Sequence, residues 1–421
     1  MTDLKRRLGR LGATPPIGPR PGSDVPDADG DKTSPLDDLR ARMATILGRP
    51  RPQPLSPADP TLTTLPFACE STPWGPRYRR VERLRPSHHV GRMPVDAARS
   101  ARSEVLALLA LDSTLAGVDT KRAVYFDTET TGLGGAGVVA FLVGVCWFDA
   151  DGVPVLEQLL LRQPGEERPI LERFAELVQK ASLLVSYNGK SFDWPMMQAR
   201  YVMNHLAVLP ERPHLDLLHV GRRLHRERLG ACRLVALESE VLGFVRGEDI
   251  DGAEVPSRYS HFLRTGDEEA LRAVVEHNAW DVVSMAALVG LYGEPLEGLD
   301  ERDLVALART YRRAKALEEA NEAATHALAR GAGPEALRTR AMVAKARGDR
   351  AAALRDFSRL AESVDDERVR LELAKLYEHY VKAPLQALDL TLRGTGESAE
   401  AHARRQQRLE RKITRERQRN K

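Results

Sequence analysis

The chain has 421 residues, a length that predicts two or three domains, and it carries a formal net charge of only +3 with 29% charged residues. Its three cysteines are widely separated and form no C-x-x-C pair, so neither a disulfide framework nor a cysteine zinc site is indicated. Apolar runs stay well short of about 18 residues, and no hydrophobic signal region follows the first basic residues, so we expect a soluble cytoplasmic protein that does not enter a membrane.

The first two segments of the chain carry few signals of regular structure. Residues 1–64 are rich in Pro, Gly and Asp and are predicted to form a disordered N-terminal region. Residues 65–120 are expected to be an irregular and partly helical lead-in, with a helix over residues 97–111 that precedes the next domain.

Strands and helices alternate in the predicted central domain, residues 121–295. Strands are expected at 123–129, 138–149, 153–162 and 183–187, and helices at 166–180, at 194–206 and over most of the chain from there to 292. Three consecutive strands followed by alternation with helices predict an α/β fold, in which helices flank a mixed sheet. The G-x-G-x-x-G pattern from Gly132 to Gly137 precedes a β-branched strand, not a helix, so it predicts a hairpin loop and no NAD site.

Two carboxylates lie at the end of the first of these strands. Asp127 and Glu129 are two residues apart, so their side chains point to the same face of the strand. Two buried carboxylates repel each other unless a cation neutralises them, and Mg²⁺ prefers oxygen ligands. An ordinary acidic pair between a strand and a turn is the alternative interpretation of this segment.

Further carboxylates follow in a consistent order along the chain. Asp193 comes after a strand-like run and an Asn-Gly turn, at a helix start, where a carboxylate either caps the helix or reaches into a cleft. His277 and Asp281 are four residues apart in a periodic segment, so they share one helical face, as a solvated surface pair also would. With the two earlier carboxylates, Asp193 and Asp281 complete a set that can converge on two metal ions about 4 Å apart.

This order of motifs resembles the DEDD exonucleases of the ribonuclease-H-like fold, and in particular the YprB-type family of ribonuclease-H-like domains. The similarity runs from about Arg122 to Tyr292, through FDTETTGL, GVVAFLVGV, LVSYNGKSFDWP, HLDLL and HNAWDVVSM. The resemblance implies a ribonuclease-H-like sheet and metal-dependent 3′→5′ hydrolysis of phosphodiester bonds in DNA or RNA, most naturally at single-stranded 3′ ends. It also implies two divalent metal ions, Mg²⁺ or Mn²⁺.

The resemblance implies a role for each residue of the site. The metal ligands are the four carboxylates Asp127, Glu129, Asp193 and Asp281. The general base is His277, whose imidazole accepts a proton near neutral pH. In the family the base is Tyr with three residues before the fourth acid or His with four, whereas His277 has three, so Glu276 is the alternative base.

Residues around the two turns of the domain are candidates for contacts with the substrate. Asn188, Lys190 and Thr130 are expected to contact nucleic acid, although a solvated lysine is an equal alternative for Lys190. His214 and Asp216 are expected to support the site from a neighbouring helix start, and Asp216 is interpreted as a helix cap and not as a metal ligand.

The last third of the chain has a different composition, rich in Ala, Arg, Leu and Glu. Tyr311, Ala344 and Tyr377 recur every 33 residues, close to the ~34-residue tetratricopeptide period. Residues 300–395 are therefore predicted to form an all-α region of degenerate tetratricopeptide-like repeats that offers a surface to a protein partner, with a plain helical bundle as the alternative. Residues 396–421 are interpreted as a basic tail that grips phosphate or is simply a solvated end.

Two functions are therefore expected from the sequence. The first is a metal-dependent 3′→5′ exonuclease. The second is a non-catalytic nucleic-acid-binding or scaffold protein that uses the same fold and the helical repeats. The presence of all four carboxylates favours the enzyme, because a protein without catalysis has no chemical need for them.

Overall fold

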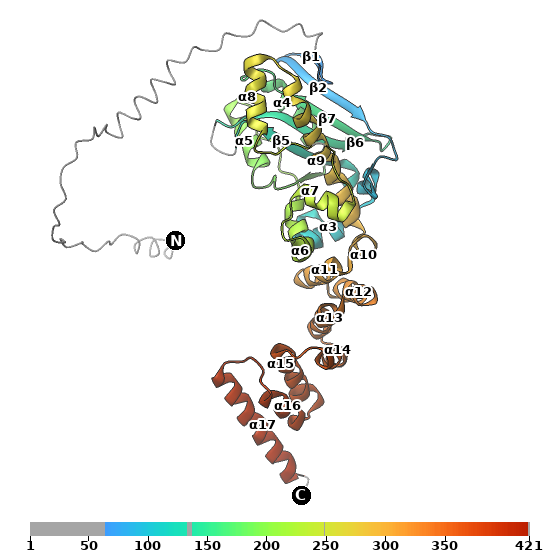
Figure 1. The fold of residues 1–421 in the computed structure, drawn as a ribbon, viewed down its shortest axis with the longest axis vertical. Helices are drawn as coiled ribbons and strands as arrows, with labels where there is room; N and C mark the ends of the chain where they lie inside the picture. The colour runs from blue at the N-terminus through green and yellow to red at the C-terminus, as the bar shows by residue number, and fades with distance from the viewer. Residues whose placement is uncertain (1–63, 133–136, 248, 420–421) are drawn as a thin grey trace, which may run out of the picture. The chain divides into compact units, whose positions relative to one another are not determined.

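The computed structural model describes residues 64–132, 137–247 and 249–419. The disorder predicted for residues 1–64 falls, except for Thr64, outside these ranges. Within them a seven-stranded mixed sheet is flanked by helices, and a series of further helices follows (Figure 1). The expected α/β class with a C-terminal all-α region is therefore confirmed.

The seven strands of the main sheet are β1 (Ala68–Thr72), β2 (Gly75–Arg83), β5 (Ala123–Thr130), β6 (Ala140–Phe148), β7 (Pro154–Leu160), β8 (Leu183–Ser186) and β9 (His214–Asp216). Across the sheet their order is β1-β2-β7-β6-β5-β8-β9. β5, β8 and β9 run parallel to one another, and every other neighbouring pair is antiparallel. β5 and β6, on either side of the glycine-rich segment, pair antiparallel as the hairpin prediction requires, and Leu133–Ala136 of that segment lie outside the described residues.

Two expectations for the sheet are wrong. Part of the lead-in expected to be irregular forms the β1–β2 hairpin, which adds two strands to the edge of the sheet at β7. Arg77 pairs with Glu70 across the hairpin at 2.7 Å, and Arg79 pairs with Glu157 of β7 at 2.7 Å. Because charged side chains make these contacts, the two strands lack a clear apolar alternation. The short strand β9 lies where mostly helix was expected. A second small hairpin joins β3 (His89–Val90) and β4 (Met93–Pro94).

The helices around the sheet are the 3₁₀ helix Val95–Ser100, α3 (Ser103–Ala110), α4 (Arg168–Lys180), α5 (Asp193–Met203), α6 (Leu217–Leu229), α7 (Leu234–Leu237), α8 (Val255–Thr265), α9 (Glu269–Gly293) and α10 (Pro295–Gly298). The helix expected at 97–111 is thus divided into a 3₁₀ helix and α3. The long helix expected around His277 is α9, which packs on β5 and β6.

Successive residues of β5 enter two different hydrophobic cores. Tyr125 packs in a core with α3, α6 and the second half of α9, whereas Phe126 packs in a core with α4, α5, α8 and the first half of α9. The alternation is the period of two expected of a strand that is covered on both faces. Helix α9 therefore passes from one core to the other, and His277 and Asp281 lie at the transition.

The helical region consists of α11 (Glu301–Arg313), α12 (Leu317–Ala329), α13 (Gly333–Arg347), α14 (Arg350–Ser363), α15 (Glu367–Leu376), α16 (Pro384–Leu392) and α17 (Ala399–Arg419). Consecutive helices pack on each other from α11 to α17. Tyr311 and Ala344 lie in the last turn of α11 and α13, and Tyr377 lies just after α15, which agrees with a repeating helix pair. Their identity as tetratricopeptide repeats stays a prediction.

The basic C-terminal segment is largely the helix α17, and part of its charge is used inside the protein. The Glu378 carboxylate is fully buried and pairs with Arg408 at 2.7 Å and Lys412 at 2.8 Å. Burial alone would raise the pKa of Glu378, but these two cations lower it to about 2. Over the described ranges, none of the helices is long and apolar enough to cross a membrane.

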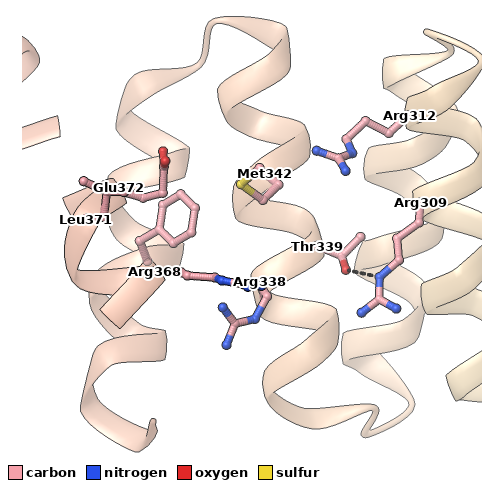
Figure 2. Close-up of a pocket in the computed structure, with 9 residues that line it drawn as sticks. Arg309, Arg312, Arg338, Thr339, Met342, Arg368, Leu371 and Glu372 are labelled. Carbon is pink, nitrogen blue, oxygen red and sulfur yellow. Dashed lines mark hydrogen bonds between the residues drawn. The ribbon is translucent and has the colours of Figure 1, made fainter. Parts of the chain in front are cut away.

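Figure 2 shows a pocket of about 430 Å³ in the helical region. Four arginines line it: Arg309, Arg312, Arg338 and Arg368. Arg309 donates to the Thr339 hydroxyl at 3.3 Å and also pairs with Glu335 at 2.6 Å. Arg338 pairs with Asp366 at 2.9 Å, so two of the four arginines are already neutralised by the protein.

Candidate active site

Three separate segments bring four carboxylates to one edge of the sheet. Asp127 and Glu129 lie at the end of β5, Asp193 is the first residue of α5 after β8, and Asp281 lies on α9. Because β5 and β8 are parallel, their carboxyl ends meet at this edge, which is where open α/β sheets bind their ligands. The carboxylates lie close enough that the charge of Asp127 interacts with those of the other three.

The pKa values of Asp127, Glu129 and Asp193 indicate that the negative charges of these three groups are poorly neutralised. Burial, followed by repulsion from the neighbouring carboxylates, raises the pKa of Asp127 well above its usual range. Burial also raises the pKa of Glu129 to about 7, with His277 opposing the shift, and the pKa of Asp193 to about 6. A cation bound among these groups would relieve both the burial and the repulsion.

Asp193 reaches toward the other carboxylates and does not cap its helix. The N-cap position of α5 is Phe192, so the interpretation of Asp193 as an N-cap is wrong. Its Oδ1 atom accepts a hydrogen bond from the hydroxyl of Thr128, which lies on β5 between Asp127 and Glu129. This contact fixes the third carboxylate beside the first two.

Asn278 fixes Asp127 from above the sheet. Asp127, Gly144 and Gln158 face one another across β5, β6 and β7. The Asn278 amide donates to Asp127 Oδ2 at 3.1 Å and accepts from Gln158 Nε2 at 2.9 Å. Gly144 leaves the space for this contact, because a Cβ atom there would lie 2.1 Å from Asn278 Oδ1. Neither Asn278 nor Gln158 was expected in the site; a polar residue on the buried face of α9 is the signal that could have indicated it.

Arg246 is a further residue that the sequence did not indicate. Its side chain is 3% exposed and pairs with Glu238, which is fully buried, through two hydrogen bonds of 2.7 Å. It also pairs with the Asp281 carboxylate. Burial alone would lower the pKa of Arg246, but Glu238 and Asp281 together raise it. The structure thus places a cation of the protein against the fourth carboxylate of the site.

His277 lies beside Asp281 and is oriented by a second carboxylate. Its Nδ1 atom lies 2.6 Å from Asp249 Oδ1, and its Nε2 atom lies 3.5 Å from Asp281 Oδ2. Burial alone would lower the pKa of His277, but Asp281, Asp249 and Glu129 together raise it. Glu276, the alternative base, is exposed to solvent. Asp249 is separated from His277 by 28 residues in the chain, so no local pattern connects the two.

The candidates for substrate contacts lie at the edge of the cluster. Asp216 caps α6 and accepts the backbone N–H groups of Asn188 at 2.8 Å and Lys190 at 3.2 Å, so its interpretation as a cap is confirmed. The Lys190 ammonium lies 3.4 Å from Asp112. The Thr130 hydroxyl donates to the Gly132 carbonyl at 2.8 Å. Contacts of these residues with nucleic acid remain a prediction.

His214 supports the β8–β9 edge as a neutral side chain. Its Nε2 atom lies 2.7 Å from the Ser186 hydroxyl, and burial, with a smaller contribution from Lys190, lowers its pKa to about 3. Between about pH 6.5 and 3 the unfolded chain therefore binds a proton at this residue that the folded protein does not bind. The stabilising contribution of His214 should be present above pH 6.5 and decline as the pH falls.

We expect the unfolding free energy of the wild type, relative to a His214→Gln variant, to fall by about 1.4 kcal/mol per pH unit below pH 6.5. Urea denaturation of both proteins at several pH values measures this difference. Taking the difference removes the contributions of the other titrating groups. A difference that does not change with pH would show that His214 is protonated in the folded protein.

The donor set fits a hard divalent cation, although the side chains do not form a ready site. Carboxylate oxygens are the ligands that Mg²⁺ and Mn²⁺ prefer, and three of the four carboxylates, Asp127, Glu129 and Asp193, are short of positive charge. Among the described residues, however, no three His, Cys, Asp or Glu side chains are arranged as a metal-binding group. Asp281 is held by Arg246, which is one physical reason for this arrangement.

Comparisons with known proteins concern mainly the domain that carries these residues. Residues 124–292 match the family model described as RNase_H superfamily. Over 175 residues the chain is 41% identical to "Uncharacterized protein YprB" of Bacillus subtilis, a match that covers 41% of this chain and 42% of that protein. "Uncharacterized protein MJ0365" of Methanocaldococcus jannaschii is 24% identical over 185 residues, which are 40% of this chain and 97% of that protein.

A solved structure is also similar, that of the family B DNA polymerase from the hyperthermophilic archaeon Pyrobaculum calidifontis. It aligns with a TM-score of 0.32 and 16% identity, over 45% of this chain and 29% of the polymerase. The family match, together with the mixed sheet, confirms the expected ribonuclease-H-like domain. It concerns this domain and not the helical region.

Proposed function

Because residues 124–292 form a ribonuclease-H-like domain, we propose that the protein is a metal-dependent nuclease that removes nucleotides from the 3′ ends of single-stranded DNA or RNA. The observation that supports this proposal most directly is the convergence of Asp127, Glu129, Asp193 and Asp281 from three separate segments. Gathering four carboxylates costs stability in a protein that binds no cation, so their convergence needs a functional reason.

In this proposal the residues of the site have three roles: metal ligands, a general base, and side chains that hold the carboxylates in position. The four carboxylates would hold one or two Mg²⁺ or Mn²⁺ ions, which would polarise the scissile phosphate and acidify a water molecule. His277 would take the proton from the attacking water at Nε2, while Asp249, whose Oδ1 lies 2.6 Å from Nδ1, would hold the ring in place. Asn278 and Thr128 would keep Asp127 and Asp193 in position.

The experiment that tests the proposal is cleavage of 3′-labelled and 5′-labelled single-stranded DNA and RNA by the full-length protein with Mn²⁺ or Mg²⁺. A ladder that shortens from the 3′ end and disappears in EDTA would support the exonuclease and identify the preferred sugar. Products cut at internal positions would instead indicate an endonuclease. Absence of cleavage on every substrate would contradict the nuclease.

The rival function is a nucleic-acid-binding or scaffold protein without catalysis. One observation favours it: Asp281 is paired with Arg246, and no complete metal-binding group is present among the described residues. If this pair persists in solution with Mn²⁺ present, binding without cleavage is expected. Thermal denaturation with and without Mn²⁺ separates the two functions, because only a protein that binds the ion in its folded state is stabilised by it.

The choice of base leads to a prediction about two adjacent residues. We expect His277→Ala to lower the cleavage rate by about 10²-fold or more, because it removes the proton acceptor. Glu276→Ala, the matched control, should leave the rate nearly unchanged because Glu276 is exposed. Cleavage rates at saturating metal, with calorimetric Mn²⁺ binding alongside, measure both effects. A greater loss in Glu276→Ala would reverse the assignment.

A further inference from the structure

A pocket beside the carboxylates gathers positive charge that none of the described residues neutralises through an ion pair. Its volume is about 720 Å³, and its lining includes Tyr187, Asn188 and three arginines, Arg222, Arg226 and Arg233. The three arginines are exposed to solvent. Throughout the part of the chain that the structure describes, their guanidinium groups make neither an ion pair nor a hydrogen bond. Three free guanidinium groups around one pocket favour an anionic ligand.

The elements that carry these arginines are held in fixed positions. Arg222 and Arg226 are four residues apart on α6 and therefore share one face of the helix. Arg233 is the residue before α7. The start of α6 is joined to the neighbouring turn through Asp216, which caps the helix and also accepts the backbone N–H of Asn188. The pocket is thus formed by connected elements and not by independent surface side chains.

The turn that lines the pocket also touches the carboxylates. Asn188 adopts a left-handed conformation with φ of 67°. At the next residue, Gly189, a Cβ atom would lie 3.2 Å from Asp193 Oδ2 and 2.5 Å from Ser186 Cβ, so the backbone here passes directly against the third carboxylate. The turn Tyr187–Gly189 therefore both lines the pocket and adjoins the third carboxylate of the cluster.

We propose that Arg222, Arg226 and Arg233 form a subsite for the backbone phosphates of the single strand whose 3′ end lies at the acid cluster. This inference rests on the proposed function. Guanidinium groups bind phosphate through paired N–H donors, and phosphate contacts position a strand without reading its sequence. The subsite would hold the strand while nucleotides are removed at the adjacent carboxylates.

The pocket of the helical region (Figure 2) carries four arginines but is a weaker candidate. Arg309 and Arg338 are already paired with Glu335 and Asp366. A ligand there would have to displace these acids, which reduces the gain from binding. The pocket beside the acid cluster has no such competition among the residues that the structure describes.

The test is binding of a fluorescein-labelled single-stranded DNA oligonucleotide by the full-length protein in EDTA, followed by fluorescence anisotropy over a range of salt concentrations. The pocket variant combines Arg222→Ala, Arg226→Ala and Arg233→Ala. The control variant combines Arg350→Ala, Arg355→Ala and Arg359→Ala, which remove three exposed arginines from α14, two of them also four residues apart. Both sets are exposed, so both variants should fold.

We expect the pocket variant to bind at least about tenfold more weakly than the control. The slope of log K against log salt should be shallower by about 2, because each phosphate contact on a single strand contributes about 0.7 to it. A slope equal to that of the control variant would overturn the subsite. Retained affinity in the pocket variant would overturn it as well.

Because EDTA prevents cleavage, this test is separate from that of the nuclease. If the wild type binds the oligonucleotide through the three arginines but does not cleave it with Mn²⁺, the proposed nuclease activity is contradicted and the subsite is supported. Titration with inorganic phosphate distinguishes a free anion from a strand. If phosphate binding is lost in the pocket variant while oligonucleotide affinity is kept, the pocket is a free-anion site and the proposal is wrong.

Discussion

Asp127→Asn is expected to reduce metal-dependent cleavage of single-stranded DNA or RNA by about 10³-fold or more. The substitution keeps the shape of the side chain but removes the negative charge that interacts with the other three carboxylates. The variant should fold, because burial and repulsion already disfavour the charged form of Asp127 in the absence of metal. Cleavage rates of the labelled strands, with thermal denaturation as the check on folding, measure the effect.

The matched control for this variant is Asp151→Asn, the same change at a residue of the same domain. Asp151 is exposed, in the turn between β6 and β7, and pairs with the exposed Arg83. Its substitution should leave cleavage unchanged, because surface ion pairs contribute little. Wild-type cleavage by Asp127→Asn would remove Asp127 from the catalytic set, and equal losses in both variants would point to a general effect of charge.

Arg246→Ala is expected to lower the unfolding free energy by about 3–5 kcal/mol. The substitution leaves the fully buried Glu238 without its guanidinium partner and also removes the partner of Asp281. A buried unpaired carboxylate costs far more than the ion pair contributes. Urea denaturation measures the loss, and Glu238→Gln added to Arg246→Ala should recover part of it because the unpaired charge disappears.

The control for Arg246 is Arg258→Ala, whose arginine pairs with Glu254 on an exposed helix face and should change stability by less than about 0.5 kcal/mol. Mn²⁺ provides a second measurement. With Asp281 released from Arg246, the ion should raise the melting temperature of the variant more than that of the wild type. If Arg246→Ala is as stable as the Arg258→Ala control, the buried pair between Arg246 and Glu238 is absent in solution.

The elements that could be predicted from the sequence are those with a strong local pattern. β6 is a nearly continuous apolar run, β5 and β7 contain shorter ones, and α9 has a long helical period, so their type and approximate bounds were predictable. The β1–β2 hairpin was not, because arginines and glutamates paired across its strands replace the apolar alternation. β9 has only three residues and was equally hard to recognise.

The residues of the site also fall into those that could be predicted from the sequence and those that could not. The carboxylates and His277 belong to motifs whose residues are close in sequence, so the amino-acid sequence alone is enough to name them. Arg246 lies 35 residues from Asp281 and has no motif of its own, so only the folded chain shows that it pairs with this carboxylate. Asn278 adjoins His277, but its contact with Gln158 depends on the space above Gly144, which requires the strand register.

Helix α9 enters both hydrophobic cores, and this affects how the chain can be divided. The core around the second half of α9 continues into α11, α12 and α13, through residues such as Leu304, Ala320 and Val343. A fragment ending at Tyr292, where the family match ends, would expose apolar surface on the same helix that carries His277 and Asp281. The domain that carries the four carboxylates is therefore not a portable module, and the helices that follow it complete its hydrophobic interior.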